Sequence, residues 1–317
     1  MKISVAIAAC RGGRFIGAQL ASIAAQSRLP DEVIICDDGP DEATALAVRQ
    51  FSGELPLTYQ INPVPLGVTG NFNKVLSLAT GEVVFLCDQD DVWYPQKIAE
   101  MSRFFASGEV IGVFCDSDIA DENGKVAGIT HLETRGYGYL RNEPVGVWQG
   151  QLAASCRCFP AAGHDMAVSA ALLKRVLPLP GLPACHDNYL GVAGAALGAW
   201  RICPCSLGIF RRHGESCSGA GQKMSLAAQW RAARQSVKDN TFAWNAALFQ
   251  AVAERLPELP DKTQMMLLKR AEYSQHRAEM NTNWWKRLPL ICREIRSGNY
   301  RKFGRGWKNV VQDLFLR

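Results

Sequence analysis

The first 120 residues alternate between short apolar runs and amphipathic segments. The run at residues 83–87 shows no polar alternation, which is typical of a strand covered on both faces in a parallel sheet. The alternation at residues 3–10 suits a first strand. Three more strands are expected at residues 32–38, at 57–63 and from residue 110 onward, with turns or loops and helices within residues 15–26, 39–51 and 67–81. This succession predicts an α/β domain with a mostly parallel central sheet and right-handed crossovers.

The rest of the chain carries a different pattern. Residues 123–163 are rich in Gly and aromatic residues and are expected to form a looser region. From about Ser225, apolar residues recur at three- and four-residue spacing, which predicts helices that are broken near Pro257 and Pro260. We therefore expect two domains, an α/β domain over residues 1–221 and a helical extension over residues 222–317.

Carboxylates cluster where the predicted strands end. Asp88, Asp90 and Asp91 follow the apolar run at residues 83–87, and Asp37 and Asp38 end an earlier strand. The carboxyl ends of parallel strands face one crevice, so these groups are expected to converge there. Clustered carboxylates repel one another unless a cation lies among them, and oxygen ligands suit Mg²⁺ or Mn²⁺. The alternative is a solvated acidic turn before the next helix.

Charge differs between the two predicted domains. Residues 1–221 hold 17 Lys and Arg against 22 Asp and Glu, a net of −5, and residues 222–317 hold 18 against 8, a net of +10, which together give +5. Within residues 284–317, nine basic and two acidic residues are interleaved with Trp284, Trp285, Tyr300, Phe303, Trp307 and Phe315. This mixture suits an anionic membrane surface, and a solvated helical face packed on the first domain is the alternative. Nucleic acid is not expected as a partner, because no nucleic-acid motif accompanies the charge.

Several protein classes are excluded by simpler features. Apolar runs fall far short of the ~20 residues of a membrane span, and the apolar start continues into an Arg/Gly-rich loop, as a first strand does, and not into a signal-peptide cleavage site. The eleven cysteines are odd in number, and several lie inside apolar strands, which fits a reducing cytosol. Neither a P-loop nor a G-x-G-x-x-G fingerprint occurs.

A family resemblance rests on blocks that occur in order between residues 3 and 220. These blocks are VAIAACRGGRFIGAQLASIAAQS, EVIICDDGPDEAT, LGVTGNFNKVLSLATGEVVFLCDQDDVWYPQKI, FCDSDIADENGK, GHDMAVSAALL, HDNYLG and FRRHGESCSG. The chain resembles the inverting family 2 glycosyltransferases with the GT-A fold, and specifically their rhamnosyltransferase-like branch. The resemblance implies a Rossmann-like α/β fold, a nucleotide-sugar donor, a divalent ion and a single displacement that inverts the anomeric carbon.

The resemblance also implies a metal site. Asp88 and Asp90 match the family's Asp-x-Asp pair, with Asp90 as the direct metal ligand and Asp91 in support. His213 matches a late histidine that closes over the diphosphate and can join the metal ligands. The diphosphate would then depend on the metal, because no phosphate-binding loop is present.

Other positions are implied as substrate contacts. Asp187 matches the family's general base, and Asp38, with Asp37 beside it, matches the acid that contacts the base or ribose of the nucleotide. Further candidate contacts are Arg11, His164 and His186. After the first strand the family usually shows Thr-Tyr-Asn, where this chain has Ala9-Cys10-Arg11. A helix cap is the alternative for Asp187, since Asp is a preferred capping residue.

The resemblance leaves donor and acceptor open. The DQDDVW sequence favours dTDP-rhamnose, with UDP- or GDP-sugars as alternatives. A sugar-phosphate nucleotidyltransferase is a second possible class. Such an enzyme should have a Gly/Lys/Arg-rich first loop for a triphosphate, and Arg11-Gly12-Gly13-Arg14 resembles that loop weakly. The Gln-x-x-Arg-Trp signature of processive enzymes is missing, so addition of one or a few sugars is expected. The expected acceptor is a bacterial cell-surface glycan, such as lipopolysaccharide or O-antigen, presented on a lipid at the cytoplasmic face of the membrane and facing residues 123–163.

Overall fold

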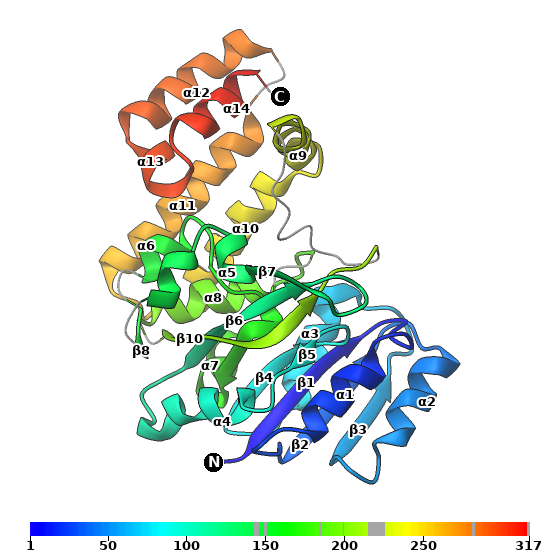
Figure 1. Ribbon diagram of the computed structural model, residues 1–317. Helices are drawn as coiled ribbons and strands as arrows, with labels where there is room; N and C mark the ends of the chain where they lie inside the picture. Colours follow the sequence, from blue (N-terminus) through cyan, green and yellow to red (C-terminus); the bar gives the residue numbers. More distant parts are fainter. Residues whose placement is uncertain are drawn as a thin grey trace. The chain divides into compact units, whose positions relative to one another are not determined.

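The computed structural model describes residues 1–142, 146–148, 151–183, 186–198, 200–214, 226–280 and 283–315 (Figure 1). The chain forms two compact units. Unit 1 comprises residues 1–149, 160–190 and 198–222, and unit 2 comprises residues 150–159, 191–197 and 223–317. The predicted boundary at residues 221 and 222 lies outside the described residues and stays a prediction.

Unit 1 is built on one mixed sheet. The main strand order is β3-β2-β1-β4-β9-β6-β10-β5; six of these eight strands point the same way, and β9 and β5 run antiparallel to their neighbours. Short strands β7 and β8 pair with β6 and β10. The strands are β1 (Ile3–Ala9), β2 (Glu32–Asp37), β3 (Leu57–Ile61), β4 (Val83–Asp88), β5 (Val92–Trp93), β6 (Gly112–Ala120), β7 (Val126–Thr130), β8 (Gly146–Val147), β9 (Met166–Ser169) and β10 (Trp200–Arg211).

Helices cover both faces of this sheet. Alternate β1 residues, including Ile3, Val5 and Ile7, form one cluster with the apolar side of α1, whereas α3 packs on β1 and β2 from the other side (Figure 1). The helices of unit 1 are α1 (Ile16–Ala24), α2 (Glu42–Gln50), α3 (Gly67–Leu78), α4 (Lys97–Ser102), α5 (His131–Thr134) and α7 (Ala170–Val176), with 3₁₀ turns η1 (Arg103–Ser107), η2 (Gly138–Asn142) and η3 (Gly163–Asp165). Helix α8 (His186–Ala196) begins in unit 1.

The expected α/β fold with a mostly parallel sheet is confirmed, and so are the five strands and three helices expected in the first 120 residues. The described residues of 123–163, expected to be looser, form the short elements β7, α5, η2, β8 and α6 (Gln151–Ser155), joined by turns and loops. Strands β9 and β10 were also not expected. Pro204 interrupts β10, and two register shifts against β6 follow, so its sequence lacks a regular two-residue pattern.

Unit 2 is helical. Apart from α6 and part of α8, it contains α9 (Leu226–Lys238), α10 (Thr241–Arg255), α11 (Asp261–Glu279), α12 (Trp284–Arg296), α13 (Asn299–Phe303) and α14 (Trp307–Phe315). The predicted helical extension is therefore confirmed, with the break between α10 and α11 at the two prolines. Among the helices of the described residues, none combines the length and the apolar character that crossing a bilayer requires.

The interior of unit 2 contains an ion pair. The buried Arg277 of α11 donates from Nε and Nη2 to the two carboxylate oxygens of Asp313 in α14, at 2.7 and 2.9 Å. The Tyr300 hydroxyl of α13 donates to the same carboxylate, at 2.8 Å. One buried carboxylate thus joins three helices.

Candidate functional site

The carboxyl ends of β1, β2 and β4 meet at one edge of the sheet. In the strand register Ala9 lies opposite Asp37, and Ala8 lies opposite Asp88. The side-chain amide of Asn71, in α3, donates to the main-chain oxygens of Ala9 and Cys36 at 3.1 and 2.9 Å. The buried Asn71 therefore fixes the ends of two neighbouring strands. Asp37 and Asp88 lie at this edge on either side of β1, and their convergence on one ligand stays a prediction.

Gln89, the middle residue of the Asp-x-Asp sequence, holds the loop after β1. Its Oε1 accepts from the Cys10 main-chain N–H at 2.8 Å, and its Nε2 donates to the Cys10 carbonyl at 2.9 Å. A Cβ atom on Gly12 would lie 2.3 Å from Gln89 Oε1, so a side chain there would push Gln89 away from Cys10. Arg11, in the same loop, is exposed and has a left-handed backbone, with φ of 51°. Its predicted substrate contact stays a prediction.

The two acids at the end of β2 are buried and hydrogen-bonded within the protein. Asp38 accepts from the main-chain N–H groups of Leu66 and Gly67 at the start of α3, and from the Asn62 amide. Asp37 accepts from the Tyr59 hydroxyl at 2.6 Å. Both carboxylates therefore stabilise the end of β2 against neighbouring segments of unit 1. Their predicted contacts with a nucleotide stay predictions.

Asp88 and Asp90 are the accessible members of the acidic cluster. Their side chains are 35% and 20% exposed, whereas that of Asp91 is 2% exposed. His213 Nε2 lies 2.7 Å from Asp90 Oδ2, which joins two of the three predicted metal ligands directly. Asp91 accepts from the Arg211 main-chain N–H at 3.1 Å, so it anchors the end of β10 from inside the protein.

Cationic groups surround Phe15 beside this cluster. The His213 ring lies 4.4 Å from the Phe15 ring, and the guanidinium groups of Arg14 and Arg211 lie 4.9 and 5.3 Å from it. The Arg211 Nε is buried and has no hydrogen-bond partner among the described residues. These groups place positive charge next to Asp90, as binding of an anionic ligand requires.

His164 lies beneath the acids and not on the surface. Its side chain is 3% exposed, and its Nδ1 lies 3.6 Å from Asp88 Oδ2 and 3.5 Å from Asp91 Oδ2. Its Nε2 lies 3.2 Å from Asp165 Oδ2, and its ring stacks on Phe210. The buried charges of Asp165 and Asp91 raise the pKa of His164, although burial alone would lower it. His164 thus faces the acids from below.

Burial and neighbouring charges shift the pKa values of the aspartates at the end of β4. Burial and the neighbouring Asp88 raise the pKa of Asp90, although His213 opposes the shift. Burial raises the pKa of Asp91 to about 8. Burial opposes ionisation of Asp88, but the contact with His164 lowers its pKa. A cation bound among these carboxylates would reduce the repulsion between them. Asp88, Asp91 and His164 each place one ligand atom within 4.8 Å of the others, and Asp90 contacts His213 beside them. Carboxylate-rich groups of this kind suit a divalent ion such as Mg²⁺ or Mn²⁺.

His186 and Asp187 begin α8 beside these acids. The His186 ring stacks on Phe72 at 3.8 Å, it is buried, and neither ring nitrogen has a hydrogen-bond partner among the described residues. Asp187 is partly exposed and accepts from the Asn188 N–H at 2.7 Å. The helix starts at His186, so Asp187 is its second residue and does not occupy the usual capping position. Cys185, which precedes this block, lies outside the described residues.

With this geometry in view, comparison with known proteins is informative. Residues 4–159 match the model of the family described as "Glycosyl transferase family 2". These residues form a glycosyltransferase family 2 domain. The matched range contains Asp38, Asp88 and Asp90. The finer assignment to a rhamnosyltransferase-like branch stays a prediction.

Two relatives show how far the similarity to glycosyltransferases extends. An uncharacterized glycosyltransferase of Nostoc sp. is 29% identical over 219 residues, which cover 68% of this chain and 66% of the relative. A UDP-Glc:alpha-D-GlcNAc-diphosphoundecaprenol beta-1,3-glucosyltransferase of Escherichia coli is 23% identical over 39% of this chain and 49% of its own length. The chain therefore spans just under two thirds of the first relative and about half of the second.

Solved structures confirm the GT-A fold. TarS 1–349 of S. aureus, in complex with UDP-GlcNAc, superposes with a TM-score of 0.58 at 17% identity, and covers 96% of this chain and 89% of its own. A mannosyltransferase of Pyrobaculum calidifontis, in complex with GDP-Man and Mn²⁺, gives a TM-score of 0.54 at 19% identity, with 99% and 85% covered. At these identities the likeness concerns the fold.

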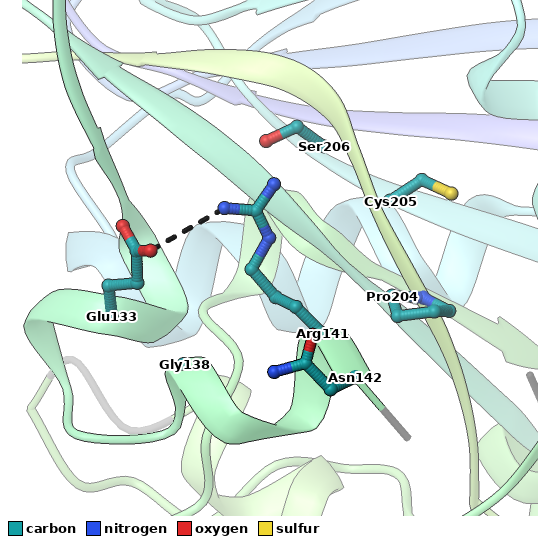
Figure 2. A pocket seen from close by; sticks show the side chains of 7 residues that line it. All are labelled: Glu133, Gly138, Arg141, Asn142, Pro204, Cys205 and Ser206. Atoms are coloured by element: carbon teal, nitrogen blue, oxygen red, sulfur yellow. Dashed lines mark ion pairs between the residues drawn. The ribbon is translucent and has the colours of Figure 1, made fainter. Parts of the chain in front are cut away.

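Unit 1 also carries a polar pocket of about 490 Å³ at β10 (Figure 2). It is lined by Glu133, Gly138, Arg141, Asn142, Pro204, Cys205 and Ser206. The Arg141 guanidinium lies 3.6 Å from Glu133 and 3.6 Å from the buried Asp116. Ser206 donates to Asp118, which also accepts from Tyr94, three residues after Asp91.

Sequence reasoning missed three residues that shape the site. Gln89, Asn71 and Arg211 all lie inside blocks that carried the resemblance, yet none is an acid or a histidine. Their importance comes from main-chain contacts between strands that are distant in the sequence. The position of Gln89 between two acids was the one signal available, because it places this side chain in the turn that carries both candidate ligands.

Proposed function

We propose that the protein is an inverting, metal-dependent glycosyltransferase that moves a sugar from a nucleotide-sugar donor to an acceptor hydroxyl. The observation that carries the proposal is the 2.7 Å contact between Asp90 and His213. It joins the end of β4, inside the family 2 match, to the end of β10, which follows that match in the sequence. The family match and the structural neighbours support the transferase class and the donor class.

The proposed metal ligands are Asp90, Asp88 and His213. A bound Mg²⁺ or Mn²⁺ would neutralise the charge that develops on the diphosphate leaving group. Arg211 and Arg14, held over Phe15, add fixed positive charge on the same side. His164, with Asp165 behind it, keeps Asp88 in place from below.

Asp187 is the proposed general base. Its carboxylate is partly exposed at the first turn of α8, where an acceptor hydroxyl can reach it. A carboxylate within hydrogen-bond reach takes the proton as the oxygen attacks the anomeric carbon. Attack from the face opposite to the diphosphate inverts that carbon. His186 offers unpartnered ring nitrogens beside this base and is the proposed contact to the transferred sugar.

The proposed donor is dTDP-rhamnose, which the DQDDVW sequence favours. UDP- and GDP-sugars are the alternatives, because similar structures are complexes with UDP-GlcNAc and GDP-Man. The proposed nucleotide contacts are Asp37, Asp38 and Arg11. The proposed acceptor is a cell-surface glycan on a lipid carrier, which places the enzyme at the cytoplasmic face of the membrane. The E. coli relative, whose name includes a diphosphoundecaprenol acceptor, supports a lipid-linked substrate.

Hydrolysis of nucleotide sugars tests the proposal. The protein is incubated with dTDP-rhamnose, UDP-glucose, UDP-GlcNAc and GDP-mannose, with Mn²⁺ or with excess EDTA, and release of the nucleoside diphosphate is measured. Metal-dependent release of the diphosphate from one donor is expected. In a separate incubation the protein is given a nucleoside triphosphate together with a sugar phosphate. Release of pyrophosphate from the triphosphate would indicate a nucleotidyltransferase instead. Donor hydrolysis at the same rate in excess EDTA as in Mn²⁺ would contradict the proposed role of the metal ion.

A further inference from the structure

Helix α14 presents its apolar residues outward and its polar residues inward. Trp307, Val311 and Phe315 are 74%, 38% and 66% exposed. Gln312 and Asp313, on the opposite side, are buried and bind Arg277. An amphipathic helix that packs on a protein core shows the reverse arrangement. We call Trp307, Val311 and Phe315 the apolar stripe.

The stripe is held rigidly. Its residues are spaced by four, so they lie in one row along the helix, about 12 Å long at 1.5 Å per residue. The bidentate bond from Arg277 to Asp313 and the bond from Tyr300 fix the buried side of α14. The helix therefore cannot turn its apolar side inward without breaking a buried ion pair. Helix α12 packs beside α14 and adds the exposed Trp285 and Ile295 (Figure 1).

The apolar stripe is accompanied by charge of one sign. Between residues 295 and 312 the sequence contains no Asp or Glu. Its basic residues in this range are exposed, and they are Arg296, Arg301, Lys302, Arg305 and Lys308. None of the five forms an ion pair with a residue in the described parts of the chain. The other aromatic residues of this segment, Tyr300 and Phe303, are buried and belong to the interior of unit 2.

We propose that the apolar stripe and these basic residues form a docking surface for an anionic lipid bilayer. Exposed Trp and Phe side chains insert at the level of the lipid headgroups, and the basic residues bind the negative surface. A second copy of the chain is the less favourable occupant, because a two-fold interface would bring the basic residues against themselves. The biological purpose of this surface, delivery of the enzyme to a lipid-linked acceptor, rests on the proposed function. Lipid binding itself is measured without sugar transfer.

Vesicle co-sedimentation of the full chain tests the surface. The vesicles contain phosphatidylglycerol and phosphatidylcholine in equal parts, or phosphatidylcholine alone. We expect binding to the anionic vesicles only, and weaker binding as salt rises from about 50 to about 500 mM. Trp307→Ser with Phe315→Ser, and separately Arg305→Glu with Lys308→Glu, should each weaken binding at least about tenfold. The charge variant should also flatten the salt dependence.

A matched control lies in the same unit. Met265→Ser with Lys262→Glu changes one exposed apolar and one exposed basic residue of α11. Met265 is twelve residues before Arg277, about 18 Å along the helix axis, so this variant should bind like the wild type. All variants should keep wild-type thermal unfolding and metal-dependent donor hydrolysis. Donor hydrolysis that is absent in every form while lipid binding behaves as expected would count against the proposed function alone.

Two results would overturn the lipid surface. One is equal binding of wild type and both surface variants to anionic vesicles. The other is a wild-type dimer in solution, measured by light scattering, that Trp307→Ser with Phe315→Ser converts to monomer while vesicles bind neither form. That second result would assign the apolar stripe to a copy of the chain.

Discussion

Three neighbouring aspartates at the end of β4 have different surroundings. Asp88 and Asp90 are 35% and 20% exposed, and Asp91 is 2% exposed. The sequence predicted the cluster, because an apolar strand running into three acids is a strong local signal. It could not predict that Asp91 faces inward toward His164, because that depends on β10 and η3, which pack there from distant parts of the chain.

Asp90→Asn should abolish metal-dependent donor hydrolysis and leave the fold intact. Removing one carboxylate from a repelling cluster relieves repulsion, so the free energy of unfolding without metal should stay equal or rise. Donor hydrolysis and thermal unfolding check both parts. Glu109→Gln, which changes an exposed acid after η1, is the control and should match the wild type. Wild-type hydrolysis by Asp90→Asn would contradict the metal site.

Asp187→Asn should lower kcat for sugar transfer by about 10²–10⁴ while donor binding changes little, because the amide cannot accept the proton. The amide oxygen can still accept from the Asn188 N–H, so the helix start is retained. Transfer kinetics and calorimetric donor titration separate the two effects. A kcat near that of the wild type would mean that Asp187 only stabilises α8.

At the scale of the elements, side chains between strands and helices hold the site. Glu32, at the start of β2, accepts from the Thr80 N–H and hydroxyl, at 2.6 and 2.8 Å, and from Ser4. The five early strands were predictable because each is an apolar run between turn residues. Strands β9 and β10 were not, since their place in the sheet depends on pairing with β4 and β6.

Glu32→Gln should reduce stability at neutral pH and have little effect in acid. Burial alone would raise the pKa of Glu32, but the bonds from Ser4 and Thr80 lower it below 4.5. A depressed folded-state pKa gives stability that is present above the unfolded pKa and is lost as pH falls. We expect a loss of about 1–2 kcal/mol at pH 7 that disappears near pH 3, measured by urea unfolding. A loss independent of pH would contradict this.

Asp313→Ala should destabilise unit 2 by about 3–5 kcal/mol, because Arg277 would remain buried without its partner. Glu272→Ala is the control, since it removes an exposed pair with Arg293 and should cost less than about 1 kcal/mol. Urea unfolding of both variants provides the comparison. Equal effects would mean that the buried pair does not hold α14.

At the scale of the whole molecule, the α/β class and the helical extension were predictable from periodicity. The interleaving of the two units was not, because unit 2 includes residues 150–159 and 191–197 from within the α/β part of the sequence. The basic, aromatic segment at residues 284–317 was predicted as one surface. The structure divides it, because Tyr300, Phe303 and Arg287 are buried. Truncation after Asn283 would also remove Asp313 from Arg277, so substitutions in the full chain test the membrane surface more cleanly.

The contact between Gln89 and the loop after β1 has a thermodynamic consequence. Its side chain binds Cys10 through both amide atoms, while its neighbours Asp88 and Asp90 are the proposed metal ligands. Any ligand that orders one side of this contact reduces the conformational entropy that the other side must lose on binding. Metal and nucleotide should therefore increase each other's affinity by the same factor, as linkage requires. The metal ion and the nucleotide would then bind tightly together, and each of them alone would bind weakly.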